Sequence, residues 1–108
     1  MKADIIYKIF ETAVNHGADI AIAAEILRGQ GEIADLATKK DILCFIGLHL
    51  DDLRRAYGTG NKKLFADIVS LCLKNNKEEV DMLMRAHETG NEKLIAETEA
   101  KYGGDAHV

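Results

Sequence analysis

A near-duplication around two Gly-Asn pairs constrains this chain most. The stretches "LRRAYGTGNKKLFAD", starting at Leu53, and "LMRAHETGNEKLIAE", starting at Leu83, are identical at nine of fifteen positions, 30 residues apart. Glycine readily adopts the positive φ angle that ends a helix. Asparagine accepts a hydrogen bond from the free N–H groups that begin one. Each copy therefore predicts a helix that ends, a chain reversal and a second helix that begins.

The residues shared by the two copies each have a structural role in such a joint. A leucine anchors the first helix, and an alanine one turn before its end lets the partner helix approach. Glycine reverses the chain, asparagine caps the second helix, and a second leucine points back. In the first copy these residues are Leu53, Ala56, Gly60, Asn61 and Leu64; in the second they are Leu83, Ala86, Gly90, Asn91 and Leu94.

Apolar residues elsewhere also recur at helical spacing, and strand patterns are almost absent. Six of them between Ile5 and Val14 form one stripe on a helix that Gly17 ends. Asp19 is the predicted N-cap of a second helix, which ends near residues 29–31. Three asparagines begin the later helices: Asn61, Asn76 and Asn91. The last of these helices has a thin apolar stripe: Leu94, Ile95, Thr98 and Tyr102.

The middle of the chain predicts one short helix and one long one. "EIADLAT" is typical of a short helix, and Thr38 with Asp41 resembles a capping box that begins a helix over 39–57. The first half of that helix, "DILCFIGLHL", is apolar nearly all round, so we expect it to be the buried central element. The fold class is therefore all-α, with six or seven short helices. Short links imply antiparallel helix hairpins.

The length of 108 residues fits one domain, and we assign residues 1–102 to it and 103–108 to a flexible C-terminal tail. "AHETGNEKLIAE" and "AYGTGNKKLFADIV" resemble the middle of an ankyrin repeat, and "IFETAVNHGADI" resembles its second helix and the turn after it. The resemblance covers about half of the chain. It implies a short α-solenoid of helix hairpins, of the ankyrin or TPR kind. A single duplication inside a compact helical bundle explains the same residues.

The sequence lacks the motifs typical of nucleic-acid binding, zinc binding and phosphate binding. The net charge is −4 and the pI about 5.5, so the basic footprint of a nucleic-acid binder is missing. Two cysteines and four scattered histidines make no zinc pattern. "GTGN" has neither the preceding strand nor the following Lys-Ser/Thr of a phosphate-binding loop. We expect no enzymatic activity, no metal and no cofactor.

Both cysteines, Cys44 and Cys72, stand in apolar runs, which predicts buried free thiols; a disulfide between them is the alternative. An early Asp4 and Glu11 are unlike a secretory signal. No apolar run approaches the roughly 20 residues that cross a bilayer. We expect a cytoplasmic protein.

Small helical proteins without cofactor motifs act mostly by presenting a surface. We therefore expect the partner to be another protein and the chain to be an adaptor, inhibitor, chaperone or regulator. Arginine, tyrosine and methionine are enriched at interface centres. The candidate partner-binding residues are Arg54, Arg55, Tyr57, Met82, Arg85 and His87.

Two alternatives remain open at the level of sequence. The first is a helix-turn-helix transcriptional regulator that uses residues 32–50, because "EIADLA" is a common opening of that motif. It requires the helix after Lys40 to be exposed to base edges, so burial of Ile42, Phe45 and Ile46 would remove it. The second is a homodimer in which the last helix pairs across a two-fold axis.

Overall fold

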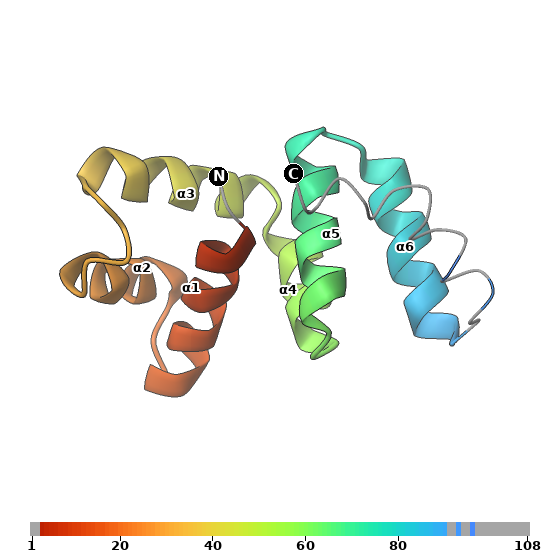
Figure 1. Cartoon of the computed structure of the whole chain (residues 1–108), viewed down its shortest axis with the longest axis horizontal. Helices are drawn as coiled ribbons and strands as arrows, with labels where there is room; N and C mark the ends of the chain where they lie inside the picture. Colours follow the sequence, from red (N-terminus) through yellow and green to blue (C-terminus); the bar gives the residue numbers. More distant parts are fainter. Residues whose placement is uncertain (1–2, 91–92, 94–95, 97–108) are drawn as a thin grey trace. The chain divides into compact units, whose positions relative to one another are not determined.

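The computed structural model describes residues 3–90 together with residues 93 and 96. These residues form six α-helices and no strand, which confirms the all-α class (Figure 1). The helices are α1 (Ala3–His16), α2 (Ile20–Gly29), α3 (Leu36–Leu48), α4 (Leu50–Gly58), α5 (Lys62–Leu73) and α6 (Lys77–Thr89). Of the predicted helix after Asn91 only residues 93 and 96 are described, and both are helical. Its stripe (Leu94, Ile95, Thr98 and Tyr102) and the tail over 103–108 lie outside the described residues.

The chain divides into two compact units, residues 1–50 with α1 to α3 and residues 51–108 with α4 to α6. Helices adjacent in the sequence pack on one another, with α2 against both α1 and α3 in the first unit and α5 against α6 in the second. Figure 1 shows α5 and α6 antiparallel. The assignment of residues 1–102 to a single domain stays a prediction.

The core of the first unit contains one face of each of its helices. The predicted stripe of α1 is confirmed in its middle, but Val14 is 66% exposed and Ile5 only half-buried. The buried apolar residues are Ile6, Ile9, Phe10, Ala13, Ala23, Ala24, Leu27, Ile33, Ile42, Phe45 and Ile46.

The core of the second unit centres on α5, of whose twelve residues eight are buried. The buried apolar residues of the unit are Leu53, Ala56, Leu64, Phe65, Ile68, Val69, Leu71, Cys72, Val80, Leu83, Met84 and Ala86. The helix buried on most sides is therefore α5, and the expectation that the segment after Lys40 takes that place is wrong.

The start of α3 also differs from the prediction. "EIADLAT" forms no separate helix, because residues 32–35 are irregular and α3 begins at Leu36. Asp35 is the N-cap: its carboxylate accepts a hydrogen bond from the N–H of Thr38, 2.7 Å away. A carboxylate at this position satisfies a free N–H and also interacts favourably with the positive end of the helix. Asp35 therefore takes the capping role that the sequence analysis assigned to Thr38.

The predicted helix over 39–57 is broken at His49. This residue has φ −125° and ψ 24°, outside the helical region, and its N–H reaches the carbonyls of Phe45 and Ile46, both at 3.2 Å. The His49 ring lies 4.9 Å from the Phe45 ring. On α3 only Ile42, Phe45 and Ile46 are buried, whereas Leu48 is 76% exposed. This helix contributes one face to the core of its unit.

Local capping is where the sequence predictions succeed most fully. The Asp19 carboxylate accepts a hydrogen bond from the N–H of Ile22 at 2.8 Å, and Asn61 Oδ1 accepts one from the N–H of Leu64 at 3.0 Å. Gly90 ends α6 in the left-handed conformation, with φ 68°. Asn76 begins α6 as predicted, but its side chain makes no capping hydrogen bond.

The repeated joint contains a contact that the sequence analysis missed. The Thr59 hydroxyl donates to the carbonyl oxygen of Ala56 at 2.7 Å and accepts from the N–H of Asn61 at 3.1 Å. The second copy repeats the first of these bonds, from Thr89 to Ala86 at 3.2 Å. Threonine occupies this position in both copies, so its repetition in the sequence indicates a structural role in the joint. Its hydroxyl satisfies one of the carbonyls that a helix end leaves free.

Gly60 lies between these bonds with φ 72°, a conformation that strains any residue with a Cβ atom. We expect Gly60→Ala to lower the free energy of unfolding by about 1 kcal/mol. Gly58→Ala is the matched control: Gly58 is the last residue of α4, with open space around its Cα. This variant should leave stability unchanged or raise it by up to about 0.5 kcal/mol. Urea unfolding measures both, and equal losses would contradict the role assigned to Gly60.

An exposed ion cluster links α2 to α3. Glu25 accepts hydrogen bonds from Arg28 Nε at 3.0 Å and from Lys39 Nζ at 2.6 Å. The bonds from Arg28, and next those from Lys39, lower the pKa of Glu25 from 4.5 to about 2. Because the folded-state pKa is depressed, the stabilisation that this carboxylate contributes is present above pH 4.5 and is lost as the pH falls through about 2.

Carboxyl NMR titration of Glu25 tests this cluster. In the wild type we expect a midpoint near pH 2, and in Arg28→Gln a midpoint shifted toward 4.5, because the largest cause of the depression is removed. Lys8→Gln is the control, since Lys8 pairs with Glu32 outside the cluster. An unchanged midpoint in Arg28→Gln would show that Arg28 is not the cause of the lowered pKa of Glu25.

Candidate functional site

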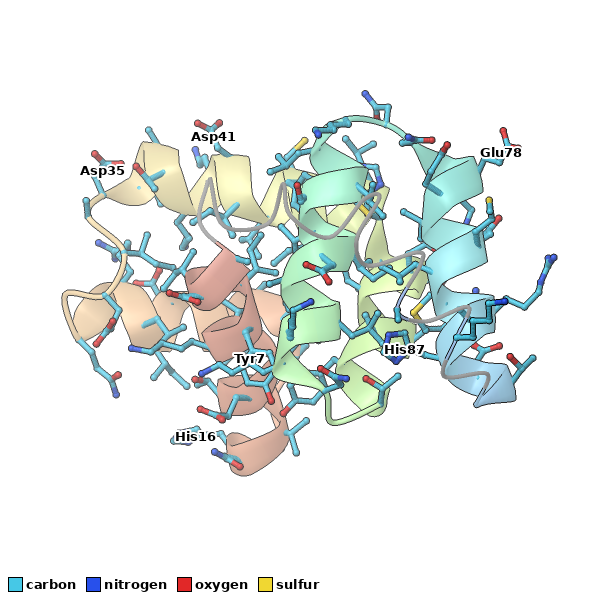
Figure 2. The ribbon with its side chains drawn as sticks, turned by 45° about the vertical axis from the view of Figure 1, so that its right-hand side comes forward. Tyr7, His16, Asp35, Asp41, Glu78 and His87 are labelled. Carbon is cyan, nitrogen blue, oxygen red and sulfur yellow. The ribbon has the colours of Figure 1, made fainter. Side chains whose placement is uncertain are left out.

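The six predicted partner-binding residues all belong to α4 and α6 of the second unit. They differ in how far they are available to another molecule. Tyr57 and His87 are half-buried, and the Tyr57 ring meets the Phe65 ring edge-on, with the centroids 6.3 Å apart. In Figure 2, His87 points toward the other helices of this unit rather than away from them. These two side chains therefore contribute to packing, whereas Arg54, Arg55, Met82 and Arg85 are exposed.

Arg55 connects α4 to α6. Its Nη2 atom donates to Glu88 Oε1 at 2.7 Å, and both side chains remain about half exposed. This hydrogen bond is the main cause that raises the pKa of Arg55, and the charges of Asp52 and Asp81 act in the same direction. The guanidinium is thus already engaged within the fold, although its exposed part can still contact another molecule.

A second and more buried link joins the same two helices. Asp52 on α4 is 8% exposed and accepts a hydrogen bond from Lys77 Nζ of α6 at 2.6 Å. Lys77 also contacts Asp81 at 2.9 Å, and the two carboxylates, Asp52 first, raise its pKa. A charged group that leaves water needs such a partner. We call the Asp52–Lys77–Asp81 and Arg55–Glu88 contacts the α4–α6 seam.

The seam is not apparent from the sequence alone. The signal was the position of Asp52, next to Leu53 and one helical turn before Ala56, both of which are buried. A carboxylate at that place on a helix shares the buried side and must find a cation nearby. The sequence cannot show that Lys77, 25 residues away, supplies it.

The outer face of α6 carries the most exposed part of the predicted site. Glu78, Met82 and Arg85 are spaced by four and then three residues, so they share one side of the helix. Figure 2 shows Glu78 pointing away from α5. Met82 is 41% exposed. Over residues 3–90, the guanidinium of Arg85 has no ion-pair partner, and the same is true of Arg54 on α4.

The two cysteines are free thiols in different environments. Cys72 is buried in α5 as predicted, and burial, helped by the charge of Asp52, raises its pKa to about 12. The predicted burial of Cys44 is wrong, since this residue is exposed on α3. It lies between Ile42 and Phe45 in sequence but on the other side of the helix. Among the residues that the structure describes, no three His, Cys, Asp or Glu side chains gather as metal ligands would.

Thiol labelling measures this difference. With a disulfide reagent at neutral pH, we expect one thiol per folded chain to react rapidly, because only the thiolate of an accessible cysteine attacks. Cys44→Ser should remove the fast reaction and Cys72→Ser should preserve it. Two fast-reacting thiols in the native protein would contradict the burial of Cys72; denaturation in urea should make both react.

The DNA-binding alternative requires the helix after Lys40 to expose Ile42, Phe45 and Ile46, and these residues are buried. Ile42, Phe45 and Ile46 are 4%, 9% and 1% exposed, so they form the inner face of α3 and cannot approach bases. The exposed side of the helix includes Leu48 and Cys44.

Comparison with known protein families, curated proteins and solved structures finds no match for this chain. The likeness to ankyrin and TPR repeats thus rests on the quoted residues and on the all-helical fold. Within the described part of the chain, no helix is both long enough and apolar enough to cross a membrane.

Proposed function

We propose that this chain is a small, non-enzymatic protein–protein interaction module, acting as an adaptor, inhibitor, chaperone or regulator. The observation that supports this best is the exposed pair Met82 and Arg85 on the outer face of α6. Methionine adapts its flexible thioether to irregular apolar pockets, and arginine is among the residues enriched at interface centres. Neither side chain is needed by the core of the unit, whose α6 stripe consists of other residues.

The chemistry of these side chains suggests the partner's surface. A planar guanidinium binds carboxylates through paired hydrogen bonds, and Met82 fills an apolar hollow beside it. The partner is accordingly a protein with an apolar pocket next to acidic groups. Arg54 on α4 supplies a further cation without an ion-pair partner in residues 3–90. The α4–α6 seam holds the two helices together before binding, which lowers the entropy lost on association.

Two further features belong to the same proposal. The helix hairpins are the units of a short ankyrin- or TPR-like stack, which is supported by the two joints with matching Thr–Ala bonds. The protein works in the cytoplasm, where an exposed thiol such as Cys44 stays reduced. Self-association through the segment after Asn91 is the competing explanation of an exposed surface, and light scattering of the purified chain distinguishes it.

The test is a capture from the native host followed by measurement with the purified partner. We expect Arg85→Glu and Met82→Ala each to weaken binding at least tenfold, as substitutions at interface centres do. Arg55→Glu should weaken binding together with stability, because it breaks the contact with Glu88. The matched control is Lys40→Glu, the same charge change in the first unit, which should bind like the wild type.

Calorimetric titration gives the dissociation constants, and thermal unfolding shows that each variant is folded. Wild-type affinity in both Arg85→Glu and Met82→Ala would remove α6 from the proposed surface. A captured partner that binds Arg55→Glu normally while Arg85→Glu fails would confine the surface to α6.

A further inference from the structure

A groove of about 590 Å³ opens in the first unit, between the start of α1, the α2–α3 connection and the first half of α3. Its lining is mainly apolar and includes Ile5, Ile33 and Ile42. Ile33 and Ile42 are core residues, 2% and 4% exposed, whereas Ile5 is half-buried. The groove therefore reaches the core of this unit. Its volume lies in the range of about 300–1,000 Å³ that binding sites occupy.

The side chains that line the groove include more carboxylates than cations. Lys8 and Glu32 pair with each other, with Nζ and Oε2 3.1 Å apart. Asp4 on α1 and Asp41 on α3 also line the groove, and neither has an ion-pair partner in the described part of the chain (Asp41 is labelled in Figure 2). Lys39, the nearby cation on α3, is engaged by Glu25. The groove thus combines an apolar floor with two uncompensated carboxylates on opposite helices.

We propose that this groove binds a cationic amphipathic segment of a partner protein. An aliphatic side chain of that segment enters between Ile5, Ile33 and Ile42, and flanking lysine or arginine residues meet Asp4 and Asp41. The long alkyl stems of lysine and arginine cover apolar surface while their charged ends reach the carboxylates. The partner contacts only residues of the first unit, so this surface shares no residue with the one proposed on α6.

Other occupants fit the charges less well. An anionic segment is repelled by Asp4 and Asp41, and a purely apolar one removes water from these carboxylates without replacing its hydrogen bonds. A second copy of the chain has a net charge of −4, so pairing at this face brings like charges together. Complementarity in charge as well as in polarity therefore selects the cationic amphipathic segment.

The experiment titrates the full-length protein with synthetic helical peptides and follows backbone amide NMR signals. The probe is a Leu-Lys amphipathic peptide of about 15 residues, long enough to form a helix on binding. Two matched peptides replace every lysine by glutamate or every leucine by serine. We expect shifts from the Leu-Lys peptide to be confined to residues 4–8, 32–34 and 38–42, and no binding of the other two.

Charge reversal on the protein gives the decisive comparison. The double variant Asp4→Lys/Asp41→Lys should bind the Leu-Lys peptide about tenfold more weakly and should gain binding of the Leu-Glu peptide. Asp51→Lys is matched to Asp4→Lys, since both aspartates are exposed in the first turn of a helix. Glu11→Lys is matched to Asp41→Lys as an exposed position within a helix. Both controls should bind like the wild type.

Several results would overturn the proposal. These are the absence of shifts with the Leu-Lys peptide, equal binding of the serine or glutamate peptide, or equal weakening by Asp51→Lys. If the NMR signals of the groove residues shift when the protein is diluted, a second copy of the chain occupies the groove. None of these outcomes affects binding through Met82 and Arg85, so the two proposals fail separately. Because Asp4 and Asp41 are exposed, the variants should stay folded; Asp4→Lys and Asp51→Lys should each lower the unfolding temperature slightly and by a similar amount, since each puts a cation in the first turn of a helix.

Discussion

The side-chain oxygen of Asn61 accepts a hydrogen bond from the N–H of Leu64 just after the chain has reversed at the end of α4. Bonds of this kind matter because the described helices have only 9 to 14 residues. Helices this short are barely stable alone, and a large share of their backbone groups lie in the unpaired end turns. Asp19, Asp35 and the Thr59 hydroxyl satisfy such groups at other ends. Packing can then stabilise each helix pair.

The second unit adds charged contacts to this scheme. Asp52 leaves water when α4 packs, and its bond to Lys77 compensates for the cost of burial. Only the carboxylate loses its water, because the Lys77 side chain stays 63% exposed; the attraction therefore mainly offsets the desolvation of Asp52 and favours the arrangement of α4 and α6 in which the two groups meet. The outer face of α6 is consequently carried by helices whose mutual position is defined. A defined arrangement of this kind favours binding at the proposed surface, because less conformational entropy is lost on association.

The two proposed surfaces have opposite chemistry. The first unit offers an apolar groove edged by the carboxylates of Asp4 and Asp41, and the second offers Met82 beside the guanidinium of Arg85. Arg85 attracts the anionic groups that Asp4 and Asp41 repel, so one segment of a partner is not suited to both surfaces. Taken together, the two proposals would let one chain bind two different segments, as the proposed adaptor role requires. Both surfaces use residues that the respective cores leave exposed.

The sequence by itself determined the helical class, the caps at Asp19 and Asn61 and the stop at Gly90. These features depend on residues within about four positions of one another, so a local pattern contains all their partners. Only the tertiary structure decided that α3 buries one face, that His49 interrupts the predicted long helix and that the apolar groove forms. It also decided the pairing of Arg55 with Glu88, 33 residues away. Burial and long-range ion pairs depend on which helix faces meet, and that follows from the packing of every helix in the unit rather than from any single segment.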